Sequence, residues 1–265
     1  MPKRRTFIIV CAVLTLVLVL GSVTALGGSL SGILKAVGEQ AEAESYESML
    51  KGYKLGGRQT FDEAFTADSE GAVQFFTSDR LWRIVARPAS HTFTSYEHLT
   101  LSCIGKTDAL SFESTDKSEF GTELVFSVDL KAPEDPDVPV LHSRYSIKTK
   151  DAAGAEKSIP LFTIDNDGDI ELAELSIDNV IYPHTEVTRL SRMFYKTLTC
   201  KLSLETRLIS VYVDGMCVIR DAEFVGLPEG ENTISRPFYF YGFNGSRNVG
   251  ASIELDNIEY YYVEG

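Results

Sequence analysis

Three carboxylates near the end of the chain have a spacing that could support acid–base chemistry. Glu254, Asp256 and Glu259 lie in the run SIELDNIEYYYVE (252–264). Two carboxylates about 5–5.5 Å apart can hydrolyse a glycosidic bond, one as the nucleophile and one as the acid/base. Successive side chains of a strand point to opposite faces, so Glu254 and Asp256 share a face and Glu259 points away unless a bulge intervenes. We therefore expect an ordinary final strand with exposed acidic positions and no catalytic pair.

A second acidic group surrounds a glycine, and its members are Asp165, Asp167, Asp169 and Glu171. Clustered carboxylate oxygens are what Ca²⁺ prefers, but an EF-hand loop has its Gly after the third acidic position, where this chain has Ile170. Asp167-Gly168 is also typical of a tight hairpin, because Gly adopts positive φ angles without strain. We expect a hairpin turn and no cofactor; a Ca²⁺ ion held by this turn and a neighbouring loop is the alternative.

The aromatic residues of RPFYFYGF (236–243) alternate between two faces. Phe238 and Phe240 share one face of such a strand, and Tyr239, Tyr241 and Phe243 share the other. A face with several tyrosines can stack on sugar rings, with the hydroxyl groups as polar handles. The residues that we expect to bind a ligand are Tyr239, Tyr241, Asn244, Arg247, Asn248 and Tyr262. The alternative is that the aromatic residues are cross-strand pairs that only stabilise the sheet.

The other reactive residue types indicate no further chemistry. The four histidines, at positions 91, 98, 142 and 184, have no Ser or Cys elbow near them, so nucleophilic catalysis is not predicted. Trp82 suits a core position or a binding platform equally. Two arrangements of the later cysteines stay open: a bridge between Cys200 and Cys217, or three buried free thiols that include Cys103. No Cys/His spacing indicates zinc.

Short β-rich runs recur between turn signals from Gln59 onward, with an alternation of period two. These runs are 71–78, 81–88, 98–105, 109–115, 123–131, 143–151, 157–165, 169–177, 197–205, 208–219, 236–243 and 252–264. No intervening segment is long enough for crossover helices, which excludes Rossmann and TIM-barrel enzymes. The pattern predicts an all-β protein, an antiparallel two-sheet jelly-roll sandwich. Asp214-Gly215 predicts a second tight hairpin, and 132–142, with three prolines, predicts a long surface loop.

Residues 1–26 combine three cations at the start with a long apolar run, and no charged side chain follows until Lys35. This composition predicts a signal peptide or a membrane anchor, since about 20 apolar residues can span the hydrocarbon of a bilayer. We favour the anchor, because the apolar run continues beyond the small residues at 23–25 and the basic flank follows the positive-inside rule. Residues 27–58 follow as a spacer and a short stalk helix, whose apolar stripe packs on the sandwich or on a neighbouring stalk.

The chain is acidic, with 25 Lys and Arg residues against 38 Asp and Glu residues among 265, a net charge of −13. The three cations of the first segment leave 22 against 38 in the rest, a net charge of −16. Non-specific affinity for nucleic acid comes from cationic side chains that displace counterions, so nucleic acid is excluded as a partner. The charge is consistent with an exported protein that stays soluble.

Several runs resemble one known family. ISVYVDGMCVI, RPFYFYGF and SIELDNIEYYYVE are similar to the second half of laminin-G-type domains of the concanavalin A-like lectin/glucanase superfamily. In that family a vYVDG hairpin precedes a last pair of strands that ends in an lDNi segment. ELVFSVDLK and IPLFTIDNDGDIEL resemble its middle and FDEAF (61–65) its opening strand, so the resemblance covers residues 59–265. It implies a jelly-roll fold, and its members include sugar-binding modules, adhesion domains and hydrolases.

The same superfamily contains laminarinase-type glycosidases with an E-x-D-x-x-E motif, which Glu254, Asp256 and Glu259 match in spacing. The glucanases carry this motif in the middle of the chain, whereas here it lies at the C-terminus. Asn257 also stands where the motif has an apolar residue. These departures favour a protein that is not a glycosidase.

We therefore predict a non-enzymatic binding module at the cell surface. Its parts are a signal peptide or anchor (1–26), a spacer and stalk helix (27–58) and a laminin-G-like β-sandwich (59–265). The expected partner is a glycan or a surface protein, with membrane contact through the N-terminal segment only. The domain is anchored on the outside of the membrane, or secreted if the first segment is cleaved. The alternatives are a protein–protein interaction ectodomain without a sugar site and, less favoured, a glycoside hydrolase.

Overall fold

The computed structural model describes residues 46–63, 65–67, 74–87, 92–95, 97–105, 108–116, 120–177, 180–226, 232–244 and 250–263. The chain divides into two compact units, Met1–Glu42 and Ala43–Gly265, and the second contains every element described below. The predicted signal peptide or anchor and the beginning of the predicted stalk helix lie outside the described residues. Within those residues, no helix has the length and apolar character needed to cross a membrane.

The described chain is an all-β structure with one short helix, α3 (Tyr46–Met49), before the first strand. The strands are β1 (Lys54–Gln59), β2 (Thr66–Ala67), β3 (Gln74–Phe76), β4 (Trp82–Arg87), β5 (Thr92–Ser95), β6 (Leu99–Cys103), β7 (Ala109–Ser114), β8 (Glu123–Lys131), β9 (His142–Asp151), β10 (Glu156–Ile164), β11 (Asp169–Ile177), β12 (Val180–Arg189), β13 (Lys196–Ser203), β14 (Leu208–Val213), β15 (Met216–Phe224), β16 (Asn232–Phe243) and β17 (Ala251–Tyr262). The all-β prediction is confirmed.

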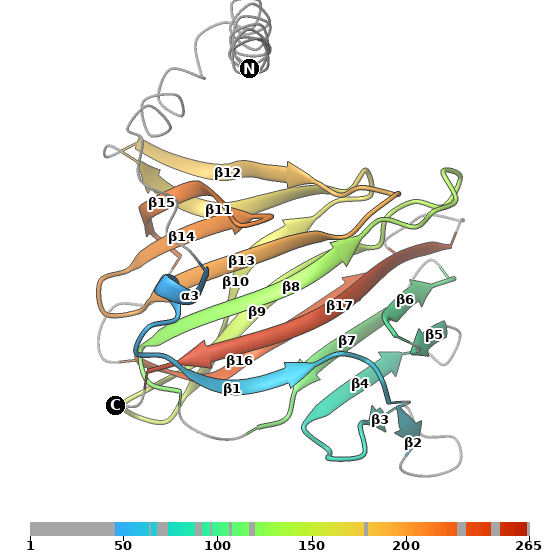
Figure 1. The fold of residues 1–265 in the computed structure, drawn as a ribbon, viewed down its shortest axis with the longest axis horizontal. Coiled ribbons are helices and arrows are strands. Elements are labelled where there is room, and N and C mark those ends of the chain that lie inside the picture. The colour runs from blue at the N-terminus through green and yellow to red at the C-terminus, as the bar shows by residue number, and fades with distance from the viewer. Residues whose placement is uncertain are drawn as a thin grey trace, which may run out of the picture. The chain divides into compact units, whose positions relative to one another are not determined.

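The strands form two antiparallel layers (Figure 1). In the β17 layer, the first half of β17 pairs with β6 and its second half with β1, while β8 lies on its other side and is followed by β13, β14 and β15. The β16 layer runs in the order β12, β11, β10, β9, β16, β7, β4, β3 and β2. A short pairing of β11 with β15 joins the two layers at one edge, so the predicted two-layer sandwich is present.

The two layers enclose a continuous apolar core. Trp82 is only 1% exposed, and its ring stacks on Phe112 with a centroid distance of 5.4 Å. The ring of Tyr260, from the opposite layer, lies 6.0 Å from Trp82. Phe238 and Phe240 point into this core, as the alternation of the sequence predicts. Trp82 is therefore a core residue and not a binding platform.

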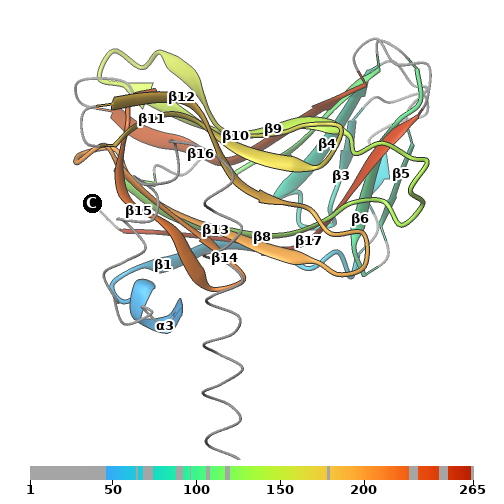
Figure 2. The ribbon, with the colours of Figure 1, turned by 90° about the horizontal axis from the view of Figure 1, so that it is seen from above.

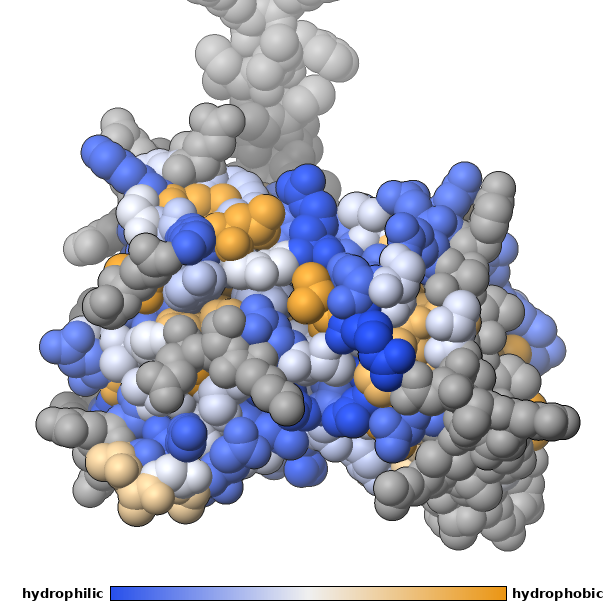
Figure 3. Space-filling view, turned by 90° about the horizontal axis from the view of Figure 1, so that it is seen from below, coloured by the Kyte–Doolittle hydropathy of each residue, from blue (hydrophilic) through white to orange (hydrophobic). Residues whose placement is uncertain are grey.

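The sandwich is curved. Figure 2 shows that the outer face of the β16 layer is hollowed between its ends, whereas the outer face of the β17 layer bulges outward. Such curvature follows from the right-handed twist of long antiparallel strands. Hydrophilic side chains cover most of the face seen from below, and the apolar side chains there form separate small patches (Figure 3). Because ligand sites are usually concave, the outer face of the β16 layer is better suited to hold a ligand than the outer face of the β17 layer.

The first part of the domain differs from the predicted pattern. Strand β1 begins at Lys54, before the point at which the alternation is recognisable in the sequence, because Gly56 and Gly57 interrupt it. The segment 61–65, expected to be an opening strand, has no strand among its described residues; Phe61 and Phe65 are instead buried in the core. Strand β12 contains Pro183, and among the described strands it pairs only with β11, which is the edge position that a strand with proline requires.

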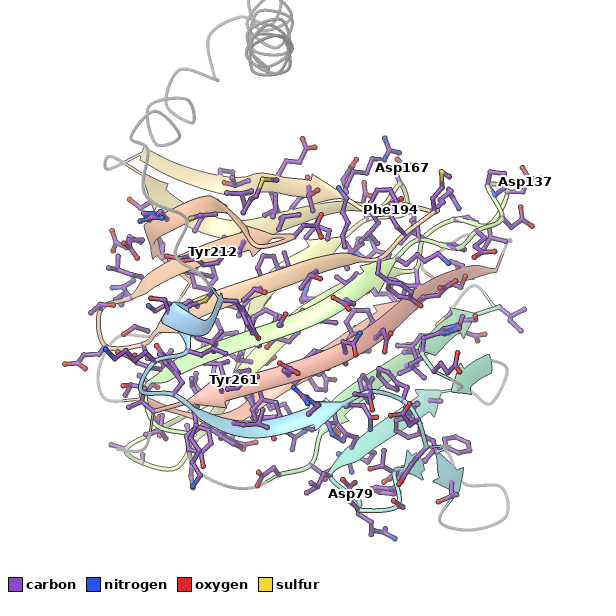
Figure 4. All side chains as sticks on the ribbon, viewed as in Figure 1. Asp79, Asp137, Asp167, Phe194, Tyr212 and Tyr261 are labelled. Carbon is purple, nitrogen blue, oxygen red and sulfur yellow. The ribbon has the colours of Figure 1, made fainter. Side chains whose placement is uncertain are left out.

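Helix α3 packs on the outer face of the β17 layer. Met49 is buried against Val125 and Tyr212, and the ring of Tyr46 meets that of Tyr261 edge-on at 6.5 Å. Figure 4 labels Tyr212 and Tyr261, which lie on either side of α3 on the sheet. The described helix lies within the predicted stalk segment, and its apolar stripe packs on the sandwich, which is one of the two alternatives that the sequence left open.

Both predicted hairpins are present. Asp165 Oδ1 accepts the backbone amides of Asp167 at 2.8 Å and Asp169 at 2.9 Å, and Gly168 has a φ of 89°. At the second hairpin, Asp214 and Gly215 have φ angles of 50° and 77°. The Asp165 carboxylate therefore shapes its own turn. The long loop between β8 and β9 also lies where the sequence predicts it, and Arg192 Nη1 donates to three of its carbonyl groups, at 2.6, 2.8 and 3.2 Å.

The three cysteines of the described residues, Cys103, Cys200 and Cys217, are free thiols. Cys200 pairs with Val211 and Cys217 with Tyr212 in neighbouring ladders, so the two cysteines point to opposite faces of the same sheet. The bridge between Cys200 and Cys217 that the sequence left open is therefore wrong. Burial, together with the nearby Asp108, raises the pKa of the Cys103 thiol to about 12.

Candidate functional site

The acidic residues of β17 share one outer face. A bulge at Asn257, with a φ of 43°, shifts the register so that Asp256 pairs with Asp129 and Glu259 with Ser127. The exception that the sequence allowed is therefore present, because the extra residue of the bulge returns Glu259 to the face of Glu254 and Asp256. A bulge of this kind is the one condition under which the sequence pattern would bring these carboxylates together.

Each of these carboxylates is held by neighbouring side chains. Glu254 accepts the hydroxyl of Tyr195 at 3.1 Å and lies 3.3 Å from Lys131 Nζ. Glu259 accepts Arg58 Nε at 2.6 Å and the hydroxyl of Tyr261 at 2.7 Å. Burial is the main cause that raises the pKa of Asp256 above its ordinary value. This face is thus an acidic surface whose charges are engaged within the protein.

No group of three or more His, Cys, Asp or Glu side chains in the described part of the chain is arranged to hold a metal ion. The Asp165 turn belongs to that part, and one of its carboxylate oxygens serves the hairpin amides.

The opposite outer face, on the β16 layer, carries a different set of side chains. Across β4, β7 and β16, Arg83 pairs with Glu113 and Glu113 with Tyr239. Two residues along, Ser111 pairs with Tyr241. Because alternate residues share a face, the outward side chains form rows across the strands, while Phe112 and Phe240 between them point into the core.

These rows line a concave site that we call the tyrosine hollow. Its volume is about 660 Å³, within the ~300–1,000 Å³ that is usual for small-molecule sites. It is lined by Arg83, Val85, Ala109, Leu110, Ser111, Glu113, Lys148, Arg236, Tyr239 and Tyr241. The hollow therefore combines two tyrosine rings with cationic and hydroxyl groups.

A buried ion-pair cluster forms part of the floor. The Glu113 side chain is only 3% exposed and lies between two arginines. Arg83 donates from Nε to Glu113 Oε1 at 2.9 Å, and its Nη2 contacts the same oxygen. Arg236 Nη1 contacts the other oxygen, Oε2. Each oxygen of one carboxylate is thus engaged by a separate guanidinium group.

Two further cations stand beside the tyrosines. Lys148 Nζ lies 4.9 Å from the centre of the Tyr239 ring, a cation–π distance. Arg144 pairs with Tyr241 across the strands and is exposed. The pKa of Arg236 lies below its ordinary value, first because of burial and then because of the neighbouring Arg83. The hollow and its border therefore carry more cations than carboxylates, although the whole chain is acidic.

The aromatic row continues beyond the hollow. Tyr241 is 38% exposed, and its ring lies 5.9 Å from that of Phe243. The ring of His142, the cross-strand partner of Phe243, follows at 4.5 Å. Burial lowers the pKa of His142. The row thus offers an exposed ring at the hollow and ends at a half-buried imidazole.

Of the six residues expected to bind a ligand, the structure brings Tyr239 and Tyr241 together. Asn244 is buried and its amide donates to the carbonyl of Gly105 at 3.2 Å, so it holds a loop in place. Tyr262 lies on β17, in the other layer, edge-on to Phe120 at 5.2 Å. Arg247 and Asn248 lie outside the described residues.

The charged residues of the hollow were not among those predicted from the sequence. Arg83 and Glu113 each stand inside an apolar strand, at the positions that face outward by alternation. A charged residue of a strand that has neighbours on both sides needs a partner, and that pattern was available in the sequence. Arg236 and Lys148 carried no comparable signal, because Arg236 is the first residue of the predicted run 236–243 and Lys148 belongs to the polar alternation of SRYSIKTKD (143–151).

No protein-family model and no curated protein matches the chain. Among solved structures, it is similar to a sialidase, with 16% identity, 74% of this chain and 18% of that chain covered and a TM-score of 0.48. It is also similar to a mutant of Trypanosoma rangeli sialidase with trans-sialidase activity, at 10% identity, with 80% and 31% covered and a TM-score of 0.45. The chain thus spans less than a third of either sialidase.

A third likeness is to a lectin-type structure. The exoplasmic/lumenal domain of VIP36, in a Ca²⁺/Man₃GlcNAc-bound form, shares 12% identity, with 70% of this chain and 84% of that chain covered and a TM-score of 0.43. With TM-scores below 0.5 and identities of 16% or less, these matches indicate only that this chain and the matched structures share a β-sandwich architecture. They also correct the prediction of a non-enzymatic protein, because sialidases are among the matched structures beside lectins.

Proposed function

We propose that this protein binds a carbohydrate in the tyrosine hollow. The observation that carries the proposal is the position of Tyr239 and Tyr241, which lie in one row of a concave site together with hydroxyl, guanidinium and ammonium donors. A sugar ring has an apolar C–H face and a rim of hydroxyl groups. Aromatic rings suit the first and hydrogen-bond donors suit the second.

The outer face of the β17 layer supports such a role less well. Helix α3 packs on it, and its carboxylates already accept hydrogen bonds from Tyr195, Arg58 and Tyr261. Its surface also bulges outward, whereas a sugar ring is best enclosed by a concave surface (Figure 2).

We further propose that the domain is a laminin-G-like sandwich on the outside of the cell, held there by residues 1–26 or released when that segment is cleaved. The apolar run and basic flank of that segment support this location. No cofactor is required by the proposed binding mode.

A glycan array tests the proposed function. The full chain is expected to bind a defined set of saccharides, and Tyr241→Ala should lower the affinity for them about tenfold through lost ring contact. Because Tyr241 is partly exposed, the free energy of unfolding should change by less than about 1 kcal/mol. The matched control is Tyr195→Ala, on the other layer, which should bind as the unmodified protein does. An array without hits, or equal losses in both variants, would overturn the proposal.

A further inference from the structure

We infer that the saccharide bound in the tyrosine hollow is acidic, with a carboxylate or sulfate group that Arg236 and Lys148 hold. The inference rests on the proposed function and narrows its ligand class. The chemistry shared by uronic acids and sulfated sugars is a ring that can stack and an anionic oxygen group beside it.

The first support is the balance of charge in the hollow. Its lining contains three cations, Arg83, Lys148 and Arg236, and one carboxylate, Glu113. The oxygens of Glu113 are engaged by the two arginines, so the group is already used within the protein. Two positive charges remain in excess at a concave site. In a chain with a net charge of −13 such a surplus is unusual, and it favours an anionic ligand.

The second support is the capacity of the cations to donate further hydrogen bonds. Arg236 uses Nη1 for Glu113, and a guanidinium group has five N–H donors. Lys148 contacts the Tyr239 ring, and in the described part of the chain no carboxylate forms an ion pair with it. A group with open donors beside a stacking ring can hold an oxyanion of a sugar that lies on that ring.

The third support is the position of the two cations. Arg236 and Lys148 are cross-strand partners on β16 and β9, and the strand register shifts between Arg236 and Tyr239. Because they are paired, both cations lie at the same end of the tyrosine row. Arg236 also shares the single carboxylate of Glu113 with Arg83, so one negative charge offsets two guanidinium groups. Burial and the nearby Arg83 lower the pKa of Arg236, which is the direction expected for such a group. An anion bound here would supply the second negative charge.

The test compares saccharides that differ only in their charge. Titration calorimetry with the full chain uses an oligomer of galacturonic acid and the same oligomer with its carboxyl groups methyl-esterified, and dextran sulfate against dextran. The acidic member of at least one pair is expected to bind ~10-fold or more tightly than its neutral partner. Its affinity should fall as the NaCl concentration rises.

The outcomes separate this inference from the proposed function. Equal binding of both members of each pair, with loss in Tyr241→Ala, would overturn the acidic ligand and leave carbohydrate binding in place. Absence of binding to any saccharide, here and on the array, would overturn both. Polyglutamate is the third arm: if it binds as tightly as the acidic saccharides, the ligand is an acidic polymer in general and the inference is wrong.

Single substitutions assign the effect to residues. Arg236→Gln should reduce the affinity for the acidic saccharide ~10-fold or more, and Lys148→Gln about threefold, with the neutral partner unaffected. Lys148→Gln is the decisive variant if Arg236→Gln fails to fold, since Lys148 forms no ion pair within the described structure. The matched control is Lys201→Gln, the same change of charge on the β17 layer. An unchanged preference for the acidic saccharide in the Lys148 and Arg236 variants would overturn the inference.

Discussion

The two outer faces of the sandwich use their charges in opposite ways. On the β17 layer, Glu254 and Glu259 each accept hydrogen bonds from tyrosine and lie beside a cation, and α3 packs over part of the surface. On the β16 layer, one carboxylate, Glu113, is shared by two arginines, and the surface is open and hollow. The carboxylates of the first face are matched within the protein, whereas the hollow on the second face has two more cations than carboxylates.

This difference shows why an acidic motif is a poor guide to a binding site. A charged group that has exchanged its water for protein partners is already satisfied, and a ligand would have to replace those partners. A cation that is half-buried beside an aromatic ring, without its own carboxylate, has lost hydration without full compensation. Sites that bind ligands are expected where such incomplete compensation coincides with a concave surface.

The largest expected effect comes from the buried carboxylate of the β16 layer. Glu113→Gln keeps the shape of the side chain but leaves Arg83 and Arg236 close together without their shared anion. We expect the free energy of unfolding to fall by about 3–5 kcal/mol, the usual cost of breaking a buried ion pair. Urea denaturation monitored by tryptophan fluorescence measures this, because Trp82 lies in the core behind the same strands.

The matched change on the other face is Glu259→Gln. Its partner Arg58 is 56% exposed, so solvent screens the pair and the loss should stay below about 1 kcal/mol. Equal losses in the two variants would show that both ion pairs are similarly solvated, and the contrast between the faces would not hold.

A smaller effect is expected at the bulge of β17. Asn257 has a φ of 43°, which β-branched residues rarely adopt, so Asn257→Val should destabilise the protein by about 1–2 kcal/mol more than Asn257→Gly. Both variants lose the bond from Asn257 Nδ2 to Asp129 at 2.9 Å, so their difference isolates the backbone strain. Saccharide binding in the tyrosine hollow should be unchanged in both. A Val variant as stable as the Gly variant would mean that the bulge relaxes easily.

Much of the fold follows from the alternation of the sequence. Phe238 and Phe240 point inward and Tyr239 and Tyr241 outward, because a strand places successive side chains on opposite faces. Strands β8 and β11 have the bounds that the pattern predicts. The two Asp-Gly hairpins follow from the freedom of glycine at positive φ. These features depend on residues that are neighbours in sequence.

The rest depends on distant partners and could not be read locally. Arg83 and Glu113 are 30 residues apart, and Arg236 is 123 residues from Glu113, so their cluster requires the register of three strands. The bulge at Asn257 moves Glu259 to the face of Glu254, and the local signal for it is only that Asn tolerates a positive φ. The twist of each whole layer determines which outer face is concave, and the sequence of a single strand does not predict that twist.

The smallest expected effect is a pH dependence at the end of the aromatic row. Burial lowers the pKa of His142, Arg144 acts in the same direction, and Asp165 opposes them. In the unfolded chain the imidazole regains its ordinary value of about 6.5, so as the pH falls through that value the unfolded chain binds a proton that the folded protein resists. The stability that the neutral imidazole contributes is therefore complete above about pH 6.5 and is lost as the pH falls toward the folded pKa.

His142→Gln should accordingly lose less stability than the unmodified protein between neutral pH and about pH 5, which urea denaturation at a series of pH values measures. A second variant tests the cause. Phe243 covers the imidazole at a ring distance of 4.5 Å, so Phe243→Ala should hydrate His142 and raise its pKa, as followed by NMR titration of the ring protons. If the pKa of His142 does not change in Phe243→Ala, burial under the aromatic ring is not what lowers it. The neighbouring charged groups, Arg144 and Asp165, would then determine this pKa.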